Sequence, residues 1–321
     1  RGLTWLARVQ HEDGHWDLKK FANPPKGKRY SGHGKSKSDS AATGLALLPF
    51  LGDGHTHRGG KYQSNVARGI NWLLDHQKED GNLFTGGEGN AHMYSHGIAT
   101  IALCEAYGMT KDELLKDPAQ AAIDYIVAAQ HSQGGWRYRP GDAGDTSVVG
   151  WQVMALKSAQ MAGLKVPEQT LAKARNYLQR ARRGKNKAEF GYQGSSGGTP
   201  AMTAEGLLCY QYLGAKAGDP QLLRTVDVLA ERVPQHGKDT SYYWYYGTQA
   251  MFHVQGEPWR RWNEAMSDAV ISQQIKDGHQ SGTWEPRDRW EDSGGRIMAT
   301  SLRLLMLEVY FRHLPLYQAL D

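Results

Sequence analysis

The chain has 321 residues, of which 40% are hydrophobic and 22% are charged, and its formal net charge is +5. This composition is ordinary for a soluble globular protein and excludes disordered and collagen-like classes. The longest apolar runs, such as "LALLPFLG", are far shorter than the ~20 residues that span a bilayer, so we expect no transmembrane helix.

The N-terminal stretch "RGLTWLARVQ" begins inside a helical pattern, with neither an initiator Met nor a signal segment. We therefore interpret the chain as a fragment of a longer protein, without its targeting region, and its compartment stays undetermined.

Cys104 and Cys209 lie in apolar helical stretches, which favours buried thiols over a disulfide. Residues 17–37, called the basic segment below, hold seven Lys or Arg against one Asp. Such a run is usually a solvated loop and only sometimes an anion site.

One unit of roughly 50 residues recurs along the chain. It consists of an amphipathic helix ending in Gln, a short turn with Gly, an aromatic residue, a polar loop and a mostly apolar helix. The clear copies are "WLARVQHEDGHW" (5–16), "WLLDHQKEDGNLF" (72–84), "YIVAAQHSQGGW" (125–136) and "AVISQQIKDGHQSGTW" (269–284). The copies at 177–192 and 228–244 are degenerate. A period of this length indicates a stacked or closed array of helical units.

The two helices of each unit differ in character. The first carries its charges on one face, as in "VARGINWLLDHQ". The second is apolar almost all round, and these segments are 40–51, 93–108, 146–163, 201–214, 242–256 and 296–314. Helices buried on every side must lie inside a ring of other helices. We therefore predict an all-α fold, an (α/α)6 toroid of six inner and six outer helices, with residues 1–321 forming one domain.

The Gln, Gly and Trp turn with its preceding helix resembles the QW repeat of squalene-hopene and oxidosqualene cyclases and of the related protein prenyltransferase β-subunits. The overall texture also resembles bacterial prenyltransferase and squalene oxidase repeat proteins. This resemblance covers nearly the whole chain and implies a toroid with an isoprenoid ligand. The cyclase motif Asp-Cys-Thr-Ala-Glu is matched by Thr203, Ala204 and Glu205, but Ala201 replaces its Asp. The Asp-x-Asp-Asp acid motif of the cyclases and the Asp-x-Cys zinc motif of the prenyltransferases have no match, so we expect no metal and no cofactor.

The turns should bring the N-termini of all inner helices to one mouth of the ring, where helix dipoles favour an anion. The acid and base candidates at this mouth are Asp145, Glu205, Asp39 and His96. By position, Asp145 is also the N-cap of the third inner helix. The candidate anion contacts are Arg137, Arg296, Lys28 and Arg29, and the candidate cavity-lining residues are Trp151, Tyr210, Tyr243, Trp244 and Tyr246. Alternatively, these aromatic residues only fill the core and the basic segment is only solvated.

We therefore expect a terpene cyclase-like or prenyltransferase-like protein that acts on or binds an isoprenoid or another hydrophobic ligand in the central cavity. If it is an enzyme, its activity should resemble that of isoprenoid cyclases or transferases. No nucleic acid is expected as a partner, while peripheral membrane contact and the oligomeric state stay open. One alternative is a non-catalytic interaction domain of a larger protein. Another is a polysaccharide lyase or glycosidase on the same toroid, because a basic cleft with Trp, Arg and His would suit acidic sugars, although no carboxylate pair is evident.

Overall fold

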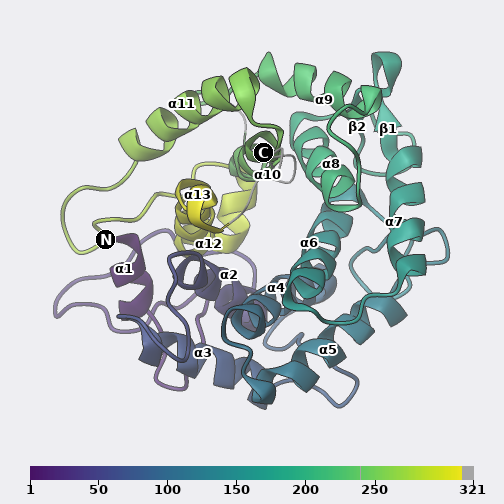
Figure 1. The fold of residues 1–321 in the computed structure, drawn as a ribbon. Helices are drawn as coiled ribbons and strands as arrows, with labels where there is room; N and C mark the ends of the chain where they lie inside the picture. The colour runs from purple at the N-terminus through teal and green to yellow at the C-terminus, as the bar shows by residue number, and fades with distance from the viewer. Residues whose placement is uncertain (239, 313–321) are drawn as a thin grey trace.

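The computed structural model describes residues 1–238 and 240–312, and these residues form an almost entirely helical ring. The inner helices are α2 (Asp39–Gly52), α4 (His92–Thr110), α6 (Thr146–Ala162), α8 (Pro200–Tyr212), α10 (Ser241–Val254) and α12 (Arg289–Leu307). The outer helices are α1 (Gly2–Arg8), α3 (Gln63–Asp75), α5 (Glu113–Ala128), α7 (Glu168–Ala181), α9 (Pro220–Ala230) and α11 (Gly256–Ser272). Each inner helix packs against the next, and α12 packs against α2, so the ring closes (Figure 1). The predicted all-α (α/α)6 toroid is confirmed.

Five short elements lie outside the twelve helices of the ring. The 3-10 helix η1 (Gly89–Ala91) leads into α4, and α13 (Val309–Arg312) follows α12. After α7, the strands β1 (Arg182–Arg183) and β2 (Glu189–Phe190) pair antiparallel around the 3-10 helix η2 (Lys185–Lys187). This hairpin lies in the degenerate fourth copy of the repeat and occupies the place of its turn.

The two rings bury their residues differently, as the hydrophobic pattern predicts. Every residue of α2 from Ser40 to Gly52 is buried, because α2 has inner neighbours on both sides and the outer ring behind it. By contrast, α3 buries one stripe, which consists of Val66, Gly69, Ile70, Trp72 and Leu73. Spacings of three and four residues place this stripe on a single helical face. The core therefore lies within the inner ring and between the two rings.

The repeated Gln and Trp residues join neighbouring units through hydrogen bonds. In the third copy, Gln130 Nε2 donates to Gly134 O at 3.0 Å within its own turn and to Thr170 O at 3.0 Å on the next outer helix. Trp136 Nε1 donates to Ile126 O at 2.8 Å, near the end of α5. These bonds satisfy carbonyl groups at a helix end and link one unit to the next. The first two copies repeat this Gln bridge, with Gln10 bonded to Asn65 O and Gln77 to Pro118 O.

The turn requires glycine for two reasons, which Gly134 illustrates. Its φ is +91°, in the left-handed region. In addition, a Cβ atom on Gly134 would lie 2.1 Å from the Lys173 carbonyl oxygen of the next outer helix. Because the turn presses against a helix backbone, any side chain here would push the two units apart.

The sixth inner helix begins earlier than its sequence pattern predicts. The expected start was Arg296, whereas α12 begins at Arg289. The side chain of Asp288 caps this extra turn by accepting from Trp290 N at 2.8 Å and Glu291 N at 3.0 Å. At Gly295 the backbone leaves the helical region, with φ 62° and ψ −158°, so the first turn and the main helix are separated by a break. The apolar pattern identified only the part beyond this break.

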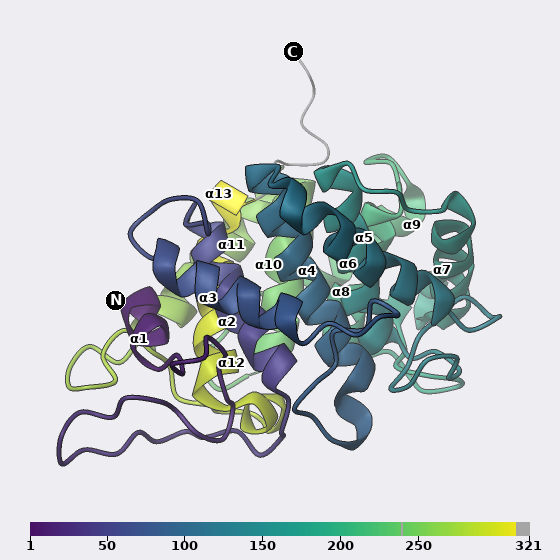
Figure 2. The same cartoon turned by 90° about the horizontal axis from the view of Figure 1, so that it is seen from below.

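The two mouths of the ring differ in their loops. Figure 2 shows the ring from the side, and the long loop between α1 and α2, which contains the basic segment, projects beyond it at the bottom.

Cys104 and Cys209 are free and buried in α4 and α8. None of the helices formed by the described residues has the length and apolar character needed to cross a membrane.

Candidate functional site

A cavity of about 1020 Å³ opens at the mouth where the inner helices begin. All six inner helices contribute residues of their first turns to its wall, together with the loops that precede them. A concave site of this size is typical of a small-molecule or oligosaccharide pocket. The aromatic residues of the wall are Tyr94, Tyr138, Trp151, Tyr192, Tyr242, Tyr243 and Trp290. A second cavity, of about 600 Å³, lies at the opposite mouth beside Glu105, Lys157 and Arg312.

Three residues on one side of the cavity form a hydrogen-bonded chain. Tyr192 donates its hydroxyl proton to Asp145 Oδ2 at 3.2 Å, and the Tyr138 and Tyr192 hydroxyl oxygens lie 2.6 Å apart. Since Tyr192 uses its only proton toward Asp145, Tyr138 must be the donor in the second bond. Tyr138 and Tyr192 line the cavity, while the Asp145 side chain is fully buried behind them. The chain therefore connects the cavity to a buried carboxylate.

Asp145 caps a helix in addition to ending this chain of hydrogen bonds. It is the N-cap of α6, as its position predicts, and its Oδ1 accepts from Val148 N at 2.8 Å. Burial raises the pKa of Asp145 to about 6, although the bonds from Val148 and Tyr192 and the charge of Arg137 oppose this rise. Arg137 Nε lies 3.5 Å from Asp145 Oδ2, which is a charge contact rather than a good hydrogen bond. At neutral pH this carboxylate is ionised, yet close to the point where it accepts a proton.

Other residues of the wall present ring faces and hydroxyl groups. Trp151 Nε1 donates to the Tyr242 hydroxyl at 3.0 Å, and the Trp290 ring lies 6.2 Å from the Tyr242 ring. Trp290 is 40% exposed, so much of its surface is available to a ligand. Tyr94 donates to Ser147 Oγ at 2.9 Å. These bonds fix the orientation of the Trp151, Tyr242 and Tyr94 rings. A fixed apolar face with polar edges suits a ligand that carries both C–H and O–H groups.

The charge of the wall is mainly positive. Its cationic residues are Lys35, Lys37, Arg232 and Arg289, whereas Glu88 is the one acidic side chain among the described residues that line it. Lys35 pairs with Asp292 at 2.7 Å, outside the wall. The excess of positive charge makes the cavity attractive to an anionic ligand.

Of the four predicted acid and base residues, only Asp145 connects to the cavity through neighbouring hydroxyl groups. Glu205 is completely buried in α8, with its carboxyl against Gly150 of α6. Burial raises its pKa well above the ordinary value, and the nearby Tyr246 hydroxyl only partly opposes this. Glu205 therefore lies behind the wall, where burial favours its neutral form.

His96 and Asp39 occupy other surroundings. The His96 ring accepts from Leu83 N through Nδ1 at 3.1 Å and donates from Nε2 to Ala122 O at 3.0 Å. Burial lowers the pKa of His96 to about 3, so the ring stays neutral and ties α4 to the turn before it and to α5. Asp39 is half-buried in the first turn of α2, against the Gly86 loop and outside the cavity wall.

The predicted anion contacts are dispersed. The buried Arg296 guanidinium donates to Ser31 O at 3.0 Å and Thr283 Oγ1 at 2.9 Å and pairs with Glu285. It thereby fastens the basic segment to the last turn and has no free edge for a ligand. Lys28 and Arg29 are exposed at positions outside the wall. Arg137 stacks on the Tyr138 ring at 4.8 Å, beside the cavity.

Of the five predicted cavity-lining residues, two line the cavity and three lie elsewhere. Trp151 and Tyr243 are part of the wall. Tyr210 faces the outer ring, where its hydroxyl donates to Asp219 Oδ2 at 2.8 Å. Trp244 and Tyr246 are buried in the core.

Sequence reasoning missed Tyr138, Tyr192 and Trp290. A signal for the first two was present, because each follows the aromatic residue of its repeat by two positions: Tyr138 follows Trp136, and Tyr192 follows Phe190. Since these aromatic residues are buried at equivalent places in the ring, the residues two positions later project toward the same mouth. Trp290 lies in the turn of α12 that precedes the break, which the apolar pattern did not include.

No protein-family model and no curated protein sequence matches the chain. Solved structures do match it. A sugar epimerase from a ruminal bacterium has a TM-score of 0.69 and 11% identity, over 98% of this chain and 96% of that one. An inactive variant of an α-1,6-mannanase from Salegentibacter in complex with α-1,6-mannotriose has a TM-score of 0.66 and 8% identity, over 97% and 98%. Cellobiose 2-epimerase from Bacillus thermoamylovorans has a TM-score of 0.65 and 10% identity, over 95% of both chains.

At these identities the likeness shows the fold alone, and the fold is the toroid of sugar epimerases and glycoside hydrolases. The predicted membership of the squalene-hopene cyclase and prenyltransferase superfamily is therefore wrong. The expected isoprenoid partner and the expected cyclase-like or transferase-like activity are therefore wrong as well. The physical reason lies in the repeat itself. Its Gln, Gly and Trp form hydrogen bonds that join one unit of the ring to the next, so they report how the toroid is built and not what it binds.

Proposed function

We propose that the chain binds an acidic oligosaccharide in the cavity and transfers a proton of that sugar through Tyr138, Tyr192 and Asp145. The observation that carries this proposal is the hydrogen-bonded chain from the cavity wall to a buried carboxylate. Support comes from the fold, because the structural neighbours named above are enzymes of sugars. The α-1,6-mannanase holds mannotriose on the same kind of toroid.

The wall has the two features that sugar recognition requires. A sugar ring presents C–H groups on its faces and hydroxyl groups at its edge. Trp151, Tyr242 and Trp290 offer ring faces for the C–H groups, while Ser147 and the tyrosine hydroxyls offer donors and acceptors for the edge. These groups already bond to one another, but each hydroxyl oxygen has two lone pairs, and a purely apolar ligand would leave their remaining hydrogen-bonding capacity unused. The cavity therefore favours a saccharide over a hydrocarbon chain.

The charges favour an acidic sugar over a neutral one. Lys37, in the loop before α2, and Arg289, in the first turn of α12, reach the wall from two different parts of the chain. Arginine binds a carboxylate through two parallel hydrogen bonds. A uronate residue supplies such a carboxylate beside its ring, and this group would also acidify the neighbouring C–H bond.

The chemistry follows from the direction of the hydrogen bonds. As the Tyr138 oxygen accepts a proton from the sugar, its own proton moves to Tyr192 and the Tyr192 proton moves to Asp145. Asp145 ends protonated, which its pKa of about 6 makes accessible near neutral pH. Such general-base transfer fits β-elimination or epimerisation. Hydrolysis by a pair of carboxylates is less well supported, because Glu88 is the one carboxylate among the described lining residues.

The experiment is to incubate the protein with uronate oligosaccharides in D2O and to follow C–H exchange by NMR and the formation of a C=C bond by ultraviolet absorbance. We expect exchange or elimination with the wild type and a loss of about 100-fold or more in Tyr192→Phe, which removes only the relaying hydroxyl. Tyr107→Phe, at the far end of α4, is the matched control and should keep full activity.

Three results would overturn the proposal. Equal activity in Tyr192→Phe and Tyr107→Phe would show that the tyrosine chain transfers no proton. Hydrolysis of the sugar without C–H exchange would identify a glycosidase, because the two-carboxylate mechanism of glycosidases removes no proton from carbon. Binding of the sugar with neither exchange nor product would identify a non-catalytic binding domain.

A further inference from the structure

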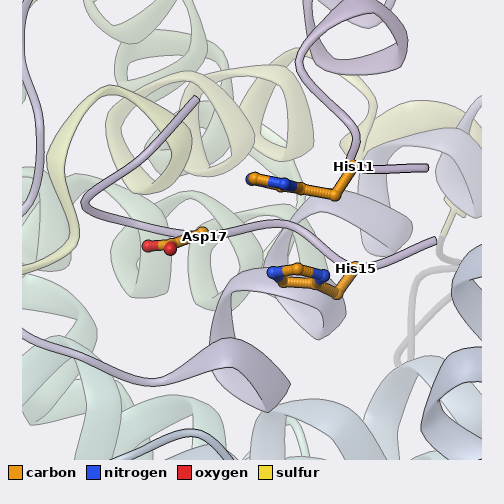
Figure 3. A group of neighbouring side chains, drawn as sticks. All are labelled: His11, His15 and Asp17. Atoms are coloured by element: carbon orange, nitrogen blue, oxygen red, sulfur yellow. The ribbon is translucent and has the colours of Figure 1, made fainter. Parts of the chain in front are cut away.

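Two imidazole rings and a carboxylate meet in the first turn of the ring, outside the cavity. His11 and His15 stack with ring centroids 4.3 Å apart, and the Asp17 carboxylate lies beyond the same edge of both rings (Figure 3). One ligand atom from each of the three residues lies within 4.8 Å of the other two. All three residues are partly exposed, so an ion can reach them from solvent.

The hydrogen bonds of the two rings leave one nitrogen of each available. His15 Nδ1 lies 2.6 Å from Asp13 Oδ1, and His11 Nε2 lies 2.8 Å from Lys20 O. Because a carboxylate and a carbonyl oxygen only accept, both of these ring nitrogens are the donors. In the neutral rings, the lone pairs are therefore on His15 Nε2 and His11 Nδ1. A histidine that binds a metal usually donates its other N–H to such a carboxylate or carbonyl group.

The turn itself does not need these side chains, as the other copies of the repeat show. The bond from His11 N to His15 O, 2.9 Å long, recurs in the second copy between Lys78 N and Asn82 O at 3.0 Å. It recurs in the third copy from His131 N at 3.0 Å. The positions of His11, His15 and Asp17 are occupied by Lys78, Asn82 and Phe84 in the second copy and by His131, Gly135 and Arg137 in the third. The same backbone turn thus forms three times, and the three groups meet in one of them.

We propose that His11 Nδ1, His15 Nε2 and Asp17 bind a divalent transition-metal ion of the Zn²⁺ type. Imidazole nitrogen and carboxylate oxygen are ordinary ligands of Zn²⁺, at about 2.0–2.2 Å. Around such an ion, the ligand atoms lie about 3.5 Å from each other, so the distances between the ligand atoms need to shorten by about 1.3 Å at most. Three protein ligands leave a fourth position for water.

Asp39 is a neighbour of this cluster rather than one of its ligands. It stands in the first turn of α2, and Asp17, His15 and His11 all act electrostatically on its carboxyl. Asp17 begins the basic segment and Asp39 follows its end, while Leu18 and Ser38, their chain neighbours, line the cavity. An ion bound by His11, His15 and Asp17 would therefore fix the first end of the basic segment near the rim of the cavity.

The test is equilibrium dialysis of the purified chain against Zn²⁺ after treatment with a chelator, with the bound metal measured by elemental analysis. We expect one equivalent of Zn²⁺ per chain and a rise in the thermal unfolding midpoint, because an ion that binds only the folded state stabilises it. His15→Ala should lose the bound equivalent. Asp13→Asn, which keeps the ligands but weakens the orientation of His15, should lower the affinity about tenfold or more.

Two further variants keep the test decisive if His15→Ala folds poorly. Asp17→Asn keeps an oxygen for the bonds from Lys19 N and Lys20 N, so it preserves the loop while removing the charged ligand. His131→Ala changes the equivalent histidine of the third copy and should bind Zn²⁺ like the wild type. A wild type without stoichiometric Zn²⁺, or a folded Asp17→Asn variant with unchanged affinity, would overturn the proposal. This readout does not depend on any activity toward sugars.

Discussion

Replacing Asp145 by Asn removes the charge of a fully buried side chain and keeps an oxygen for the Val148 N–H bond. Asn and Asp are about equally good N-caps, so the start of α6 should be preserved. The free energy of unfolding should respond through the pKa of Asp145, which burial raises from its ordinary value of 3.8 to about 6. At about 1.4 kcal/mol for each pH unit, this difference corresponds to about 3 kcal/mol.

The sign of this effect follows from proton binding. Between pH 4 and pH 6 the folded wild type holds a proton on Asp145 that the unfolded chain has released, so its stability falls as the pH rises. Above about pH 6 the full cost of about 3 kcal/mol is present in the wild type, whereas the uncharged amide of the variant does not incur it. Asp145→Asn should therefore be at least as stable as the wild type at pH 7, with the difference shrinking toward zero near pH 4.

Urea unfolding of both proteins at a series of pH values measures this difference directly. Buried acids common to both proteins, such as Glu205 and Glu308, contribute to each curve, so the subtraction removes most of their effect. A wild type that is more stable than Asp145→Asn at pH 7 would refute the reasoning, since it would mean that the Arg137 charge and the two hydrogen bonds outweigh the cost of burial. A difference that does not change with pH would refute it as well.

Two further predictions concern the turns that join the units. Gly134→Ala should destabilise the protein by at least about 2 kcal/mol in thermal unfolding, because φ is positive and the Lys173 carbonyl oxygen would lie 2.1 Å from the new Cβ. Gly141 is the control, since its φ is positive but it has open space around it. Gly141→Ala should cost about 1 kcal/mol in the same assay. Equal losses would show that the contact with the next helix is unimportant. Gln130→Ala should cost about 2 kcal/mol by urea unfolding, because the buried carbonyl of Gly134 loses its partner, and a loss below about 0.5 kcal/mol would contradict the role of Gln as a link between units.

The architecture could be predicted because the repeat encodes it in local terms. Helices that are apolar all round must be surrounded, and a Gln, a Gly and a Trp at fixed offsets form the same turn each time. The capping role of Asp145 was equally local, since a cap acts on the three residues that follow it. The start of α12 was not predictable in this way, because the turn before Gly295 is polar and is held by the side chain of Asp288.

The site was harder to predict because it depends on which direction each side chain takes after folding. The sequence predicts Arg296 as a contact for an anion. In the structure its guanidinium instead donates to Ser31 and Thr283 and pairs with Glu285, and these partners come from two different loops. Glu205 matched a catalytic motif of another family, yet it lies in the core against Gly150. Both cases require distances between residues far apart in the chain, which the sequence does not contain.

The histidine pair shows a different limit. His11 and His15 belong to a turn that the repeat explains, so the repeat pattern by itself gives their side chains no separate role. Only a comparison of the same positions in all copies separates what the turn requires, which is Gln10 and Gly14, from what is particular to the first copy.

The central claim, an acidic oligosaccharide in the cavity at the mouth where the inner helices begin, is tested most directly by calorimetric titration. The protein is titrated with a uronate oligosaccharide and with its neutral counterpart of the same length, at low and at high salt. We predict that the acidic sugar binds with one site per chain and more tightly than the neutral one, and that this preference weakens as salt screens the charges of Lys37 and Arg289. Equal affinity for both sugars, or no binding of either, would contradict the account.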